Sequence, residues 1–95
     1  MVAILVDEAR WPWRGRRWAH LVSDVSYPEL HAFAGRLGIP TRAFQGDHYD
    51  VAAEHRDLAL SLGAEAVSSR ELLARLRGAG LRLPPAQRRR WVAGV

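Results

Sequence analysis

The chain has 95 residues, 48% of them hydrophobic and 25% charged, a composition typical of one ordinary globular domain. It contains no cysteine, which excludes disulfides, thiolate metal sites and cysteine nucleophiles. No apolar run approaches the roughly 18 residues of a membrane helix, and the opening MVAILV is too short and lacks the basic start of a secretory signal. We therefore expect a cytoplasmic protein without a membrane partner.

The net charge of +4 is unevenly distributed. Residues 1–17 and the tail from Pro84 are basic, whereas residues 18–83 carry seven arginines against eight acids and are close to neutral. A neutral body argues against a protein built around a broad phosphate-binding face.

The first third of the chain predicts two strands separated by a loop. VAILVD, residues 2–7, is a short apolar run ended by an acid, which is typical of a buried strand. Residues 7–17 contain Pro12 and Gly15 and predict a loop. WAHLVSD, residues 18–24, predicts a second strand with Trp18, His20 and Val22 on one face.

A helix is expected next. Ser26 and Glu29 have the spacing of a capping box, and Gly38 stands where a helix ends. Between them the apolar residues recur with the helical period: Leu30, Phe33, Ala34 and Leu37.

The second half alternates strand and helix patterns. TRAF, residues 41–44, predicts a short strand, followed by the loop QGDHYD. Asp50 is expected to cap a second helix that runs to Leu62 and ends at Gly63, with the apolar stripe Val51, Leu58, Ala59 and Leu62. AEAV, residues 64–67, predicts a small strand, and Ser68 with Glu71 repeats the capping-box spacing before a third helix ending near residues 78–80.

These elements predict a single α/β domain over residues 1–83, in the order β-β-α-β-α-β-α. We expect a mainly parallel sheet of about four strands flanked by three helices, because alternating strands and helices usually build such sheets. Residues 84–95 predict a basic tail that is peripheral or disordered, although its Trp91 can still dock on the domain.

Polar residues gather just after the predicted strands, where ligands bind in parallel α/β sheets. Imidazoles and carboxylates suit both a divalent metal ion and proton transfer. The candidate catalytic residues are His20, Asp24, His48 and Asp50, and the candidate metal ligands are Asp7, His20, His48 and Asp50. The candidate ligand-binding residues are Arg16, Trp18, Gln45, Tyr49 and Arg56. If the first two strands form a simple antiparallel pair, however, Asp7 and Asp24 lie at opposite ends.

WPWRGRRW, residues 11–18, combines three tryptophans with three arginines. Such residues can stack bases and hold phosphates, cover a pocket mouth, or anchor a contact between subunits. Tryptophans in a small domain are also commonly core residues.

Several segments together resemble the family called domain of unknown function 4031, found in bacteria and phages. The resemblance covers about residues 2–77, and the matching positions are Asp7, Gly15, Arg16, Trp18, His20, Asp24, 29–34, 44–45, 48–50 and 69–72. It implies a shared site around His20, Asp24, His48 and Asp50. Related sequences often have a longer stretch before His-Tyr-Asp, so the short Gly46–Asp47 connection implies a reduced pocket wall.

Three interpretations remain open, and whether the protein is an enzyme is left undecided among them. The first is a polar pocket that binds a divalent metal or a small phosphate-bearing ligand, with hydrolytic chemistry. The second is a non-enzymatic module that binds nucleic acid or protein through WPWRGRRW and the arginine tail. The third is a domain whose histidines and acids are structural, and in each case the chain can form a homo-oligomer.

Overall fold

The computed structural model describes residues 3–84 and contains a five-stranded mixed sheet with three α-helices. Its elements are β1 (Ile4–Val6), β2 (Trp11–Trp13), β3 (Arg16–Ser23), α1 (Tyr27–Arg36), the 3-10 helix η1 (Thr41–Ala43), β4 (Tyr49–Ala52), α2 (Ala53–Ser61), β5 (Glu65–Ala66) and α3 (Ser69–Gly78). The expected tail lies outside the described residues, apart from Pro84. Within residues 3–84, no helix has the length and apolar character needed to cross a bilayer.

The α/β class is confirmed, but the expectation of a mainly parallel, four-stranded sheet is wrong. β3 pairs antiparallel with β1, β2 and β4, and the one parallel pair in the described chain joins β1 to β5. The expected loop over residues 7–17 contains β2 and a tight turn into β3. Such a turn forces adjacent antiparallel strands, whereas a parallel pair requires a long crossover.

The turn of this hairpin is Arg14–Gly15. Arg14 has φ 51° and Gly15 has φ 73°, and the flanking Trp13 and Arg16 are paired. Positive φ at both central residues is the signature of a type I′ turn, whose twist matches that of the strands. Arginine adopts this backbone at a cost of ~1 kcal/mol, so the sequence gives only Gly15 as a turn signal.

The middle of the chain also differs from the expectation. Residues 41–43 form η1 and not a strand, and the extended segment is β4, in which Tyr49 and Val51 alternate with Asp50. α2 therefore begins at Ala53, with Ala52 as an N-cap that makes no side-chain bond, so Asp50 is not its cap.

The two capping boxes are confirmed in part. Ser26 accepts a hydrogen bond from the Glu29 amide, and Ser68 accepts one from the Glu71 amide, so α1 and α3 begin where expected. The Glu29 carboxylate does not bond back to its own cap, but accepts hydrogen bonds from the Ala3 amide and the Ser23 hydroxyl. It thereby ties the start of α1 to β1 and β3.

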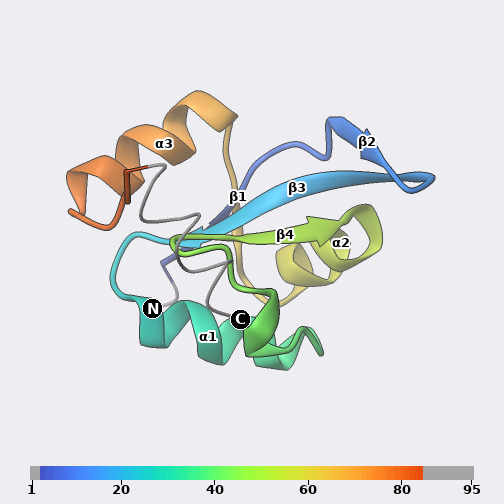
Figure 1. Ribbon diagram of the computed structural model, residues 1–95, viewed down its shortest axis with the longest axis horizontal. Coiled ribbons are helices and arrows are strands. Elements are labelled where there is room, and N and C mark those ends of the chain that lie inside the picture. The colour runs from blue at the N-terminus through green and yellow to red at the C-terminus, as the bar shows by residue number, and fades with distance from the viewer. Residues whose placement is uncertain (1–2, 85–95) are drawn as a thin grey trace.

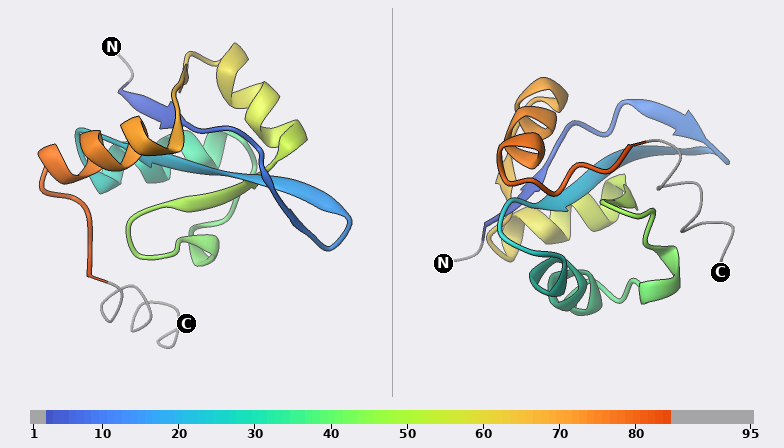
Figure 2. Two further views of the ribbon diagram at one scale, coloured as in Figure 1. Left: turned by 90° about the horizontal axis from the view of Figure 1, so that it is seen from above. Right: turned by 60° about the vertical axis from the view of Figure 1, so that its left-hand side comes forward.

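The helices form one layer on each side of the sheet (Figure 1). α1 and α2 cover one face over the larger core, which includes Val6, Leu21 and Phe33. α3 covers part of the other face through Leu72 and Leu76, which pack on Leu5 and Val22. The β2–β3 hairpin extends past the helices (Figure 2), so the α3 side of the sheet is only partly covered.

The two cores give a direct test of the packing. Leu30→Ala, at a fully buried position of α1, should lower the free energy of unfolding by about 2–5 kcal/mol, because it leaves a cavity. Leu58→Ala should change it by at most ~0.5 kcal/mol, because Leu58 is 42% exposed, against our expectation of a buried stripe position. Urea denaturation measures both, and equal losses would contradict the assignment of the core.

Candidate metal centre

The central strand β3 places His20 on the partly covered face of the sheet. Trp18, His20 and Val22 share this face, as their alternation predicts. In the neighbouring strand, Asp50 is the register partner of His20, so the two side chains project from the same face. Antiparallel pairing thus brings together two residues that are 30 positions apart.

Asp7 holds His20 in one orientation. Asp7 Oδ1 accepts a hydrogen bond from the His20 backbone amide at 2.7 Å, and Oδ2 lies 2.8 Å from His20 Nδ1. Oδ2 also accepts a hydrogen bond from Ser69 Oγ at 2.7 Å. Asp7 is 1% exposed, and burial by itself raises its pKa, but the hydrogen bonds from His20 and Ser69 outweigh burial and lower the pKa.

Because Asp7 is ionised, it can only accept, and His20 Nδ1 must be the donor. Nε2 of His20 is then the ring nitrogen with a lone pair for a metal. A carboxylate behind a histidine in this way is the usual support of a metal-binding imidazole.

His48 has the same support from a different carboxylate. Its Nδ1 lies 2.8 Å from Oδ1 of Asp47, which is fully buried. The other oxygen, Oδ2, accepts a hydrogen bond from the Leu83 amide at 2.9 Å and lies 3.6 Å from the Arg82 guanidinium. Burial by itself raises the pKa of Asp47, but these partners outweigh burial and lower the pKa, so this carboxylate is also ionised.

Asp50 faces the outer nitrogen of His48. Asp50 Oδ1 lies 3.1 Å from His48 Nε2, an ion-pair distance, but the two groups are not aligned for a hydrogen bond. This oxygen is buried and has no hydrogen-bond partner among residues 3–84. An unsatisfied buried carboxylate oxygen is costly unless an ion or water completes its environment.

Together, His20, His48 and Asp50 form a group of suitable metal ligands. One ligand atom from each lies within 4.8 Å of the others, and the His20 and His48 ring centroids are 5.3 Å apart. Two ligands of a tetrahedral zinc ion lie about 3.3 Å apart, close to the 3.1 Å between His48 and Asp50. A zinc ion held by these three side chains would have a fourth position left for water or substrate, as in catalytic rather than structural zinc sites.

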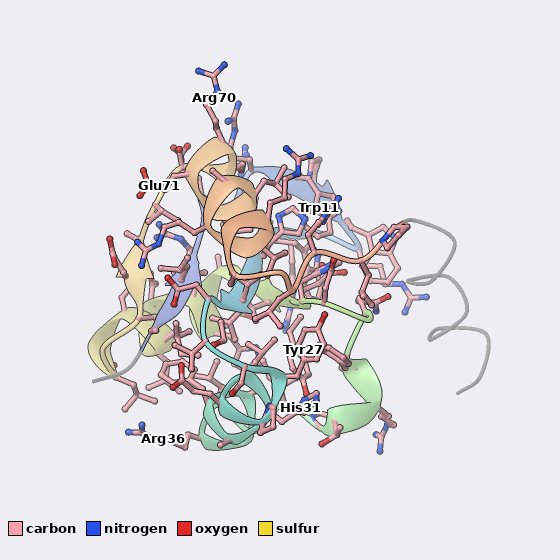
Figure 3. The ribbon with its side chains drawn as sticks, turned by 90° about the vertical axis from the view of Figure 1, so that its left-hand side faces the viewer. Trp11, Tyr27, His31, Arg36, Arg70 and Glu71 are labelled. Atoms are coloured by element: carbon pink, nitrogen blue, oxygen red, sulfur yellow. The ribbon has the colours of Figure 1, made fainter. Side chains whose placement is uncertain are left out.

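A cavity of about 260 Å³ opens beside these residues. One part of its lining is polar, with Asp7, His20, His48, Ser69 and Arg82, and the rest is apolar, with Val22, Leu72, Leu73 and Leu76. Trp11 stacks on the His20 ring at 4.9 Å between centroids, and Figure 3 shows Trp11 on the α3 side of the sheet.

The structure separates some predicted site residues from this centre. The Asp24 carboxylate forms an ion pair with Arg75 at 2.7 Å, and its amide bonds to Ala3 at the far end of β1 from Asp7. The simple antiparallel arrangement of β1 and β3 thus keeps Asp7 and Asp24 apart.

The predicted ligand-binding residues are dispersed. Arg56 contacts the backbone of the supporting residue Asp7, since its Nε donates to the Asp7 carbonyl at 2.6 Å. Tyr49 is buried on the opposite face and bonds to His31 Nδ1 at 2.7 Å, whereas Gln45 Nε2 contacts the Ala43 carbonyl at 3.5 Å. The other two lie on the hairpin: Arg16, paired with Glu54, and Trp18, bonded to the Trp13 carbonyl.

Four further residues of the centre were not among the predicted site residues: Trp11, Asp47, Ser69 and Arg82. Ser69 was detectable, since it follows a predicted strand, where polar residues of a site are expected. Asp47 directly precedes His48, but its burial depends on residues 82–83, which carry no pattern in the sequence.

A family profile with the description Protein of unknown function (DUF4031) matches residues 4–79. The chain belongs to the DUF4031 family. No curated protein and no solved structure is detectably similar to it. Family membership agrees with the resemblance in the sequence, but the DUF4031 description carries no activity, so the chemistry must be argued from the centre itself.

The environment of His48 predicts a pH dependence of stability in the metal-free protein. Burial lowers the pKa of His48, but the Asp47 and Asp50 carboxylates raise it from 6.5 to about 9. The charged form is therefore favoured by folding, and its contribution is fully present below pH 6.5 and lost as pH rises through about 9. This difference corresponds to about 3 kcal/mol.

Urea denaturation in the presence of a chelator, from pH 6 to pH 9.5, should show this loss in the wild type and in His55→Ala, a histidine outside the centre. His48→Asn should lack it. Parallel curves for wild type and His48→Asn would contradict the assigned charge.

Proposed function

We propose that the protein binds one divalent transition-metal ion through His20, His48 and Asp50 and uses it to hydrolyse a phosphate ester. The observation that carries this proposal is the matched support of the two histidines. Each turns Nδ1 toward a buried carboxylate, so Nε2 of each is the nitrogen that a metal would bind, in His48 by displacing the proton shared with Asp50, and the Asp50 oxygen completes the set. Two imidazoles and one carboxylate suit zinc and related ions.

A purely structural role explains less of this arrangement. A charged His48 between Asp47 and Asp50 would form a stable ion pair without a metal. That role does not explain why His20 is half-exposed at the cavity and is hydrogen-bonded to Asp7 through only one of its two nitrogens. A metal ion replaces the proton between His48 and Asp50 and also uses His20.

Hydrolysis is supported by what surrounds the three ligands. Two of the three ligands, His20 and His48, line the cavity, so an ion held by them would lie beside it, where it would polarise a phosphoryl oxygen and lower the pKa of water. Arg82 lines this cavity, and a guanidinium pairs readily with phosphate. Among the anionic substrates, a phosphate ester fits both the cation and the metal.

Metal binding is the first test. Zinc titration of the chelator-treated protein by calorimetry should show one site, and removal of any ligand by His20→Ala, His48→Ala or Asp50→Ala should abolish it. His55→Ala is the matched control and should bind normally. At a zinc concentration of 100 Kd, the wild type should gain about 2.7 kcal/mol of stability. No binding, or equal binding by all three ligand variants, would overturn the proposal.

The supporting carboxylates give a graded result. Asp7→Asn should lower zinc affinity by about 10–100-fold without changing the number of ions bound, because the amide supports the imidazole less strongly than a carboxylate. Unchanged affinity in Asp7→Asn would contradict the role of Asp7.

The metal-loaded wild type should hydrolyse bis(p-nitrophenyl) phosphate, and Arg82→Ala should raise KM more than it lowers kcat.

A further inference from the structure

The face of β3 that carries His20 continues onto the hairpin. Val22, His20, Trp18 and Arg16 follow one another along it at alternate positions. On β2, Trp11 and Trp13 are the register partners of Trp18 and Arg16, so their side chains share this face. We call Trp11, Trp13, Arg14, Arg16 and Trp18 the hairpin surface.

The hairpin surface is aromatic and ordered by its own contacts, with Trp13 and both arginines exposed and Trp11 and Trp18 partly buried. Trp11 stacks on His20 with an angle of 28° between the rings. Trp13 lies 5.7 Å from Trp18 between centroids and is 53% exposed. The Arg14 guanidinium lies 4.6 Å above the Trp13 ring. A row of indoles therefore leads from the proposed metal ligand His20 to the tip of the hairpin.

The charge of this segment has one sign. Residues 9–23 contain Arg10, Arg14, Arg16 and Arg17 and no acidic residue. Arg16 is paired with Glu54 at 2.8 Å, but both side chains are more than half exposed, so this bond is readily exchanged for another anion. Exposed aromatic faces beside cations are the features that hold single-stranded nucleic acid, with bases on the rings and phosphates on the guanidinium groups.

The same charge disfavours a second copy of this chain as the occupant. A two-fold symmetric contact brings two copies of the same surface together, so the arginines of the two hairpin surfaces would lie close to one another and repel. A duplex is also disfavoured, because its bases are already stacked and cannot lie on the indoles. The cavity beside His20 has a volume of about 260 Å³, which is below the ~300–1,000 Å³ of pockets for drug-sized ligands, so it has room for one phosphodiester group and not for an extended strand.

We propose that the hairpin surface binds single-stranded nucleic acid and presents one phosphodiester to the centre formed by His20, His48 and Asp50. This inference rests on the metal centre proposed above and names its substrate class. In the reaction, the oxygen of water bonds to phosphorus, one P–O ester bond breaks, and the leaving oxygen takes up the proton that water releases. The products are a phosphomonoester and a free hydroxyl on the two ends of the cut strand.

Binding is measured by fluorescence anisotropy with labelled oligothymidylate, the matching oligouridylate and a duplex, using the zinc-loaded protein. Loss of one stacking partner should weaken single-strand binding by about fivefold or more in Trp13→Ala. Arg14→Gly should weaken binding and flatten its salt dependence by about 0.7 in the log–log slope, the effect of one lost phosphate contact. Glycine adopts the positive φ of Arg14 without strain, so we expect Arg14→Gly to fold as the wild type does.

Two substitutions away from the hairpin surface serve as controls. Arg42→Ala removes an exposed arginine on η1, and Leu58→Ala removes an exposed apolar side chain on α2, so both should bind as the wild type does. Cleavage of the oligonucleotides is followed on denaturing gels with wild type, Trp13→Ala and His20→Ala. The DNA and RNA arms show which strand is cut, and His20→Ala should bind the strand but not cut it.

The outcomes separate the two proposals. Zinc binding with no single-strand binding, or with binding that Trp13→Ala and Arg14→Gly leave unchanged, overturns the inference and leaves the metal centre standing. Single-strand binding that depends on the hairpin but produces no zinc-dependent cleavage also overturns it as a statement about substrate. Failure of zinc to bind overturns both. A dimer that Trp13→Ala converts to a monomer, with no strand bound, assigns the surface to a protein contact instead.

Discussion

The arrangement of the centre depends on the carboxylate of Asp7. It is buried at the end of β1, accepts hydrogen bonds from the backbone and ring of His20 on β3, and accepts another from Ser69 at the start of α3. The backbone carbonyl of the same residue accepts a hydrogen bond from Arg56 on α2. One residue therefore links the sheet to helices on both of its faces, and the cost of burying its charge is offset by hydrogen bonds that also orient the His20 imidazole.

Three carboxylates surround the two histidines of the centre, more than one protonated histidine would neutralise. Asp47 and Asp50 flank His48, and Asp7 stands behind His20. Arg82, 3.6 Å from Asp47, offsets part of this negative charge, and the remainder favours a cation, whether a proton or a metal ion. The proton is held by a single nitrogen, whereas a metal ion is shared among several donors. This difference favours the metal when all the donors are placed together in advance by the fold.

The sequence predicts the parts of the fold that depend on local chemistry. Ser26 and Ser68 start their helices, and the alternation of Trp18, His20 and Val22 assigns one face of β3 correctly. The sequence predicts the arrangement of the sheet less well, because the antiparallel pairing depends on a turn at Arg14, and arginine rarely adopts a positive φ.

The same division holds for the centre. His20, His48 and Asp50 are recognisable by residue type and by their place after or within extended segments, and the structure brings them within reach of one another. Asp24 has the same chemistry and a similar place in the sequence, but it lies at the other end of a short antiparallel pair, next to Arg75. Which strand end meets which is a property of long-range pairing, and no local pattern carries it.

The two-residue turn of the hairpin restricts how the length of the hairpin can change. Because only the two turn residues join β2 to β3, the distance from the tip of the hairpin to His20 is set by the number of paired residues alone. Adding two residues to each strand moves the tip outward by about 7 Å and restores the same face, whereas adding one inverts every side chain beyond it. The distance from the hairpin tip to His20 can therefore change only in discrete steps, and such a change leaves His20, His48 and Asp50 in place.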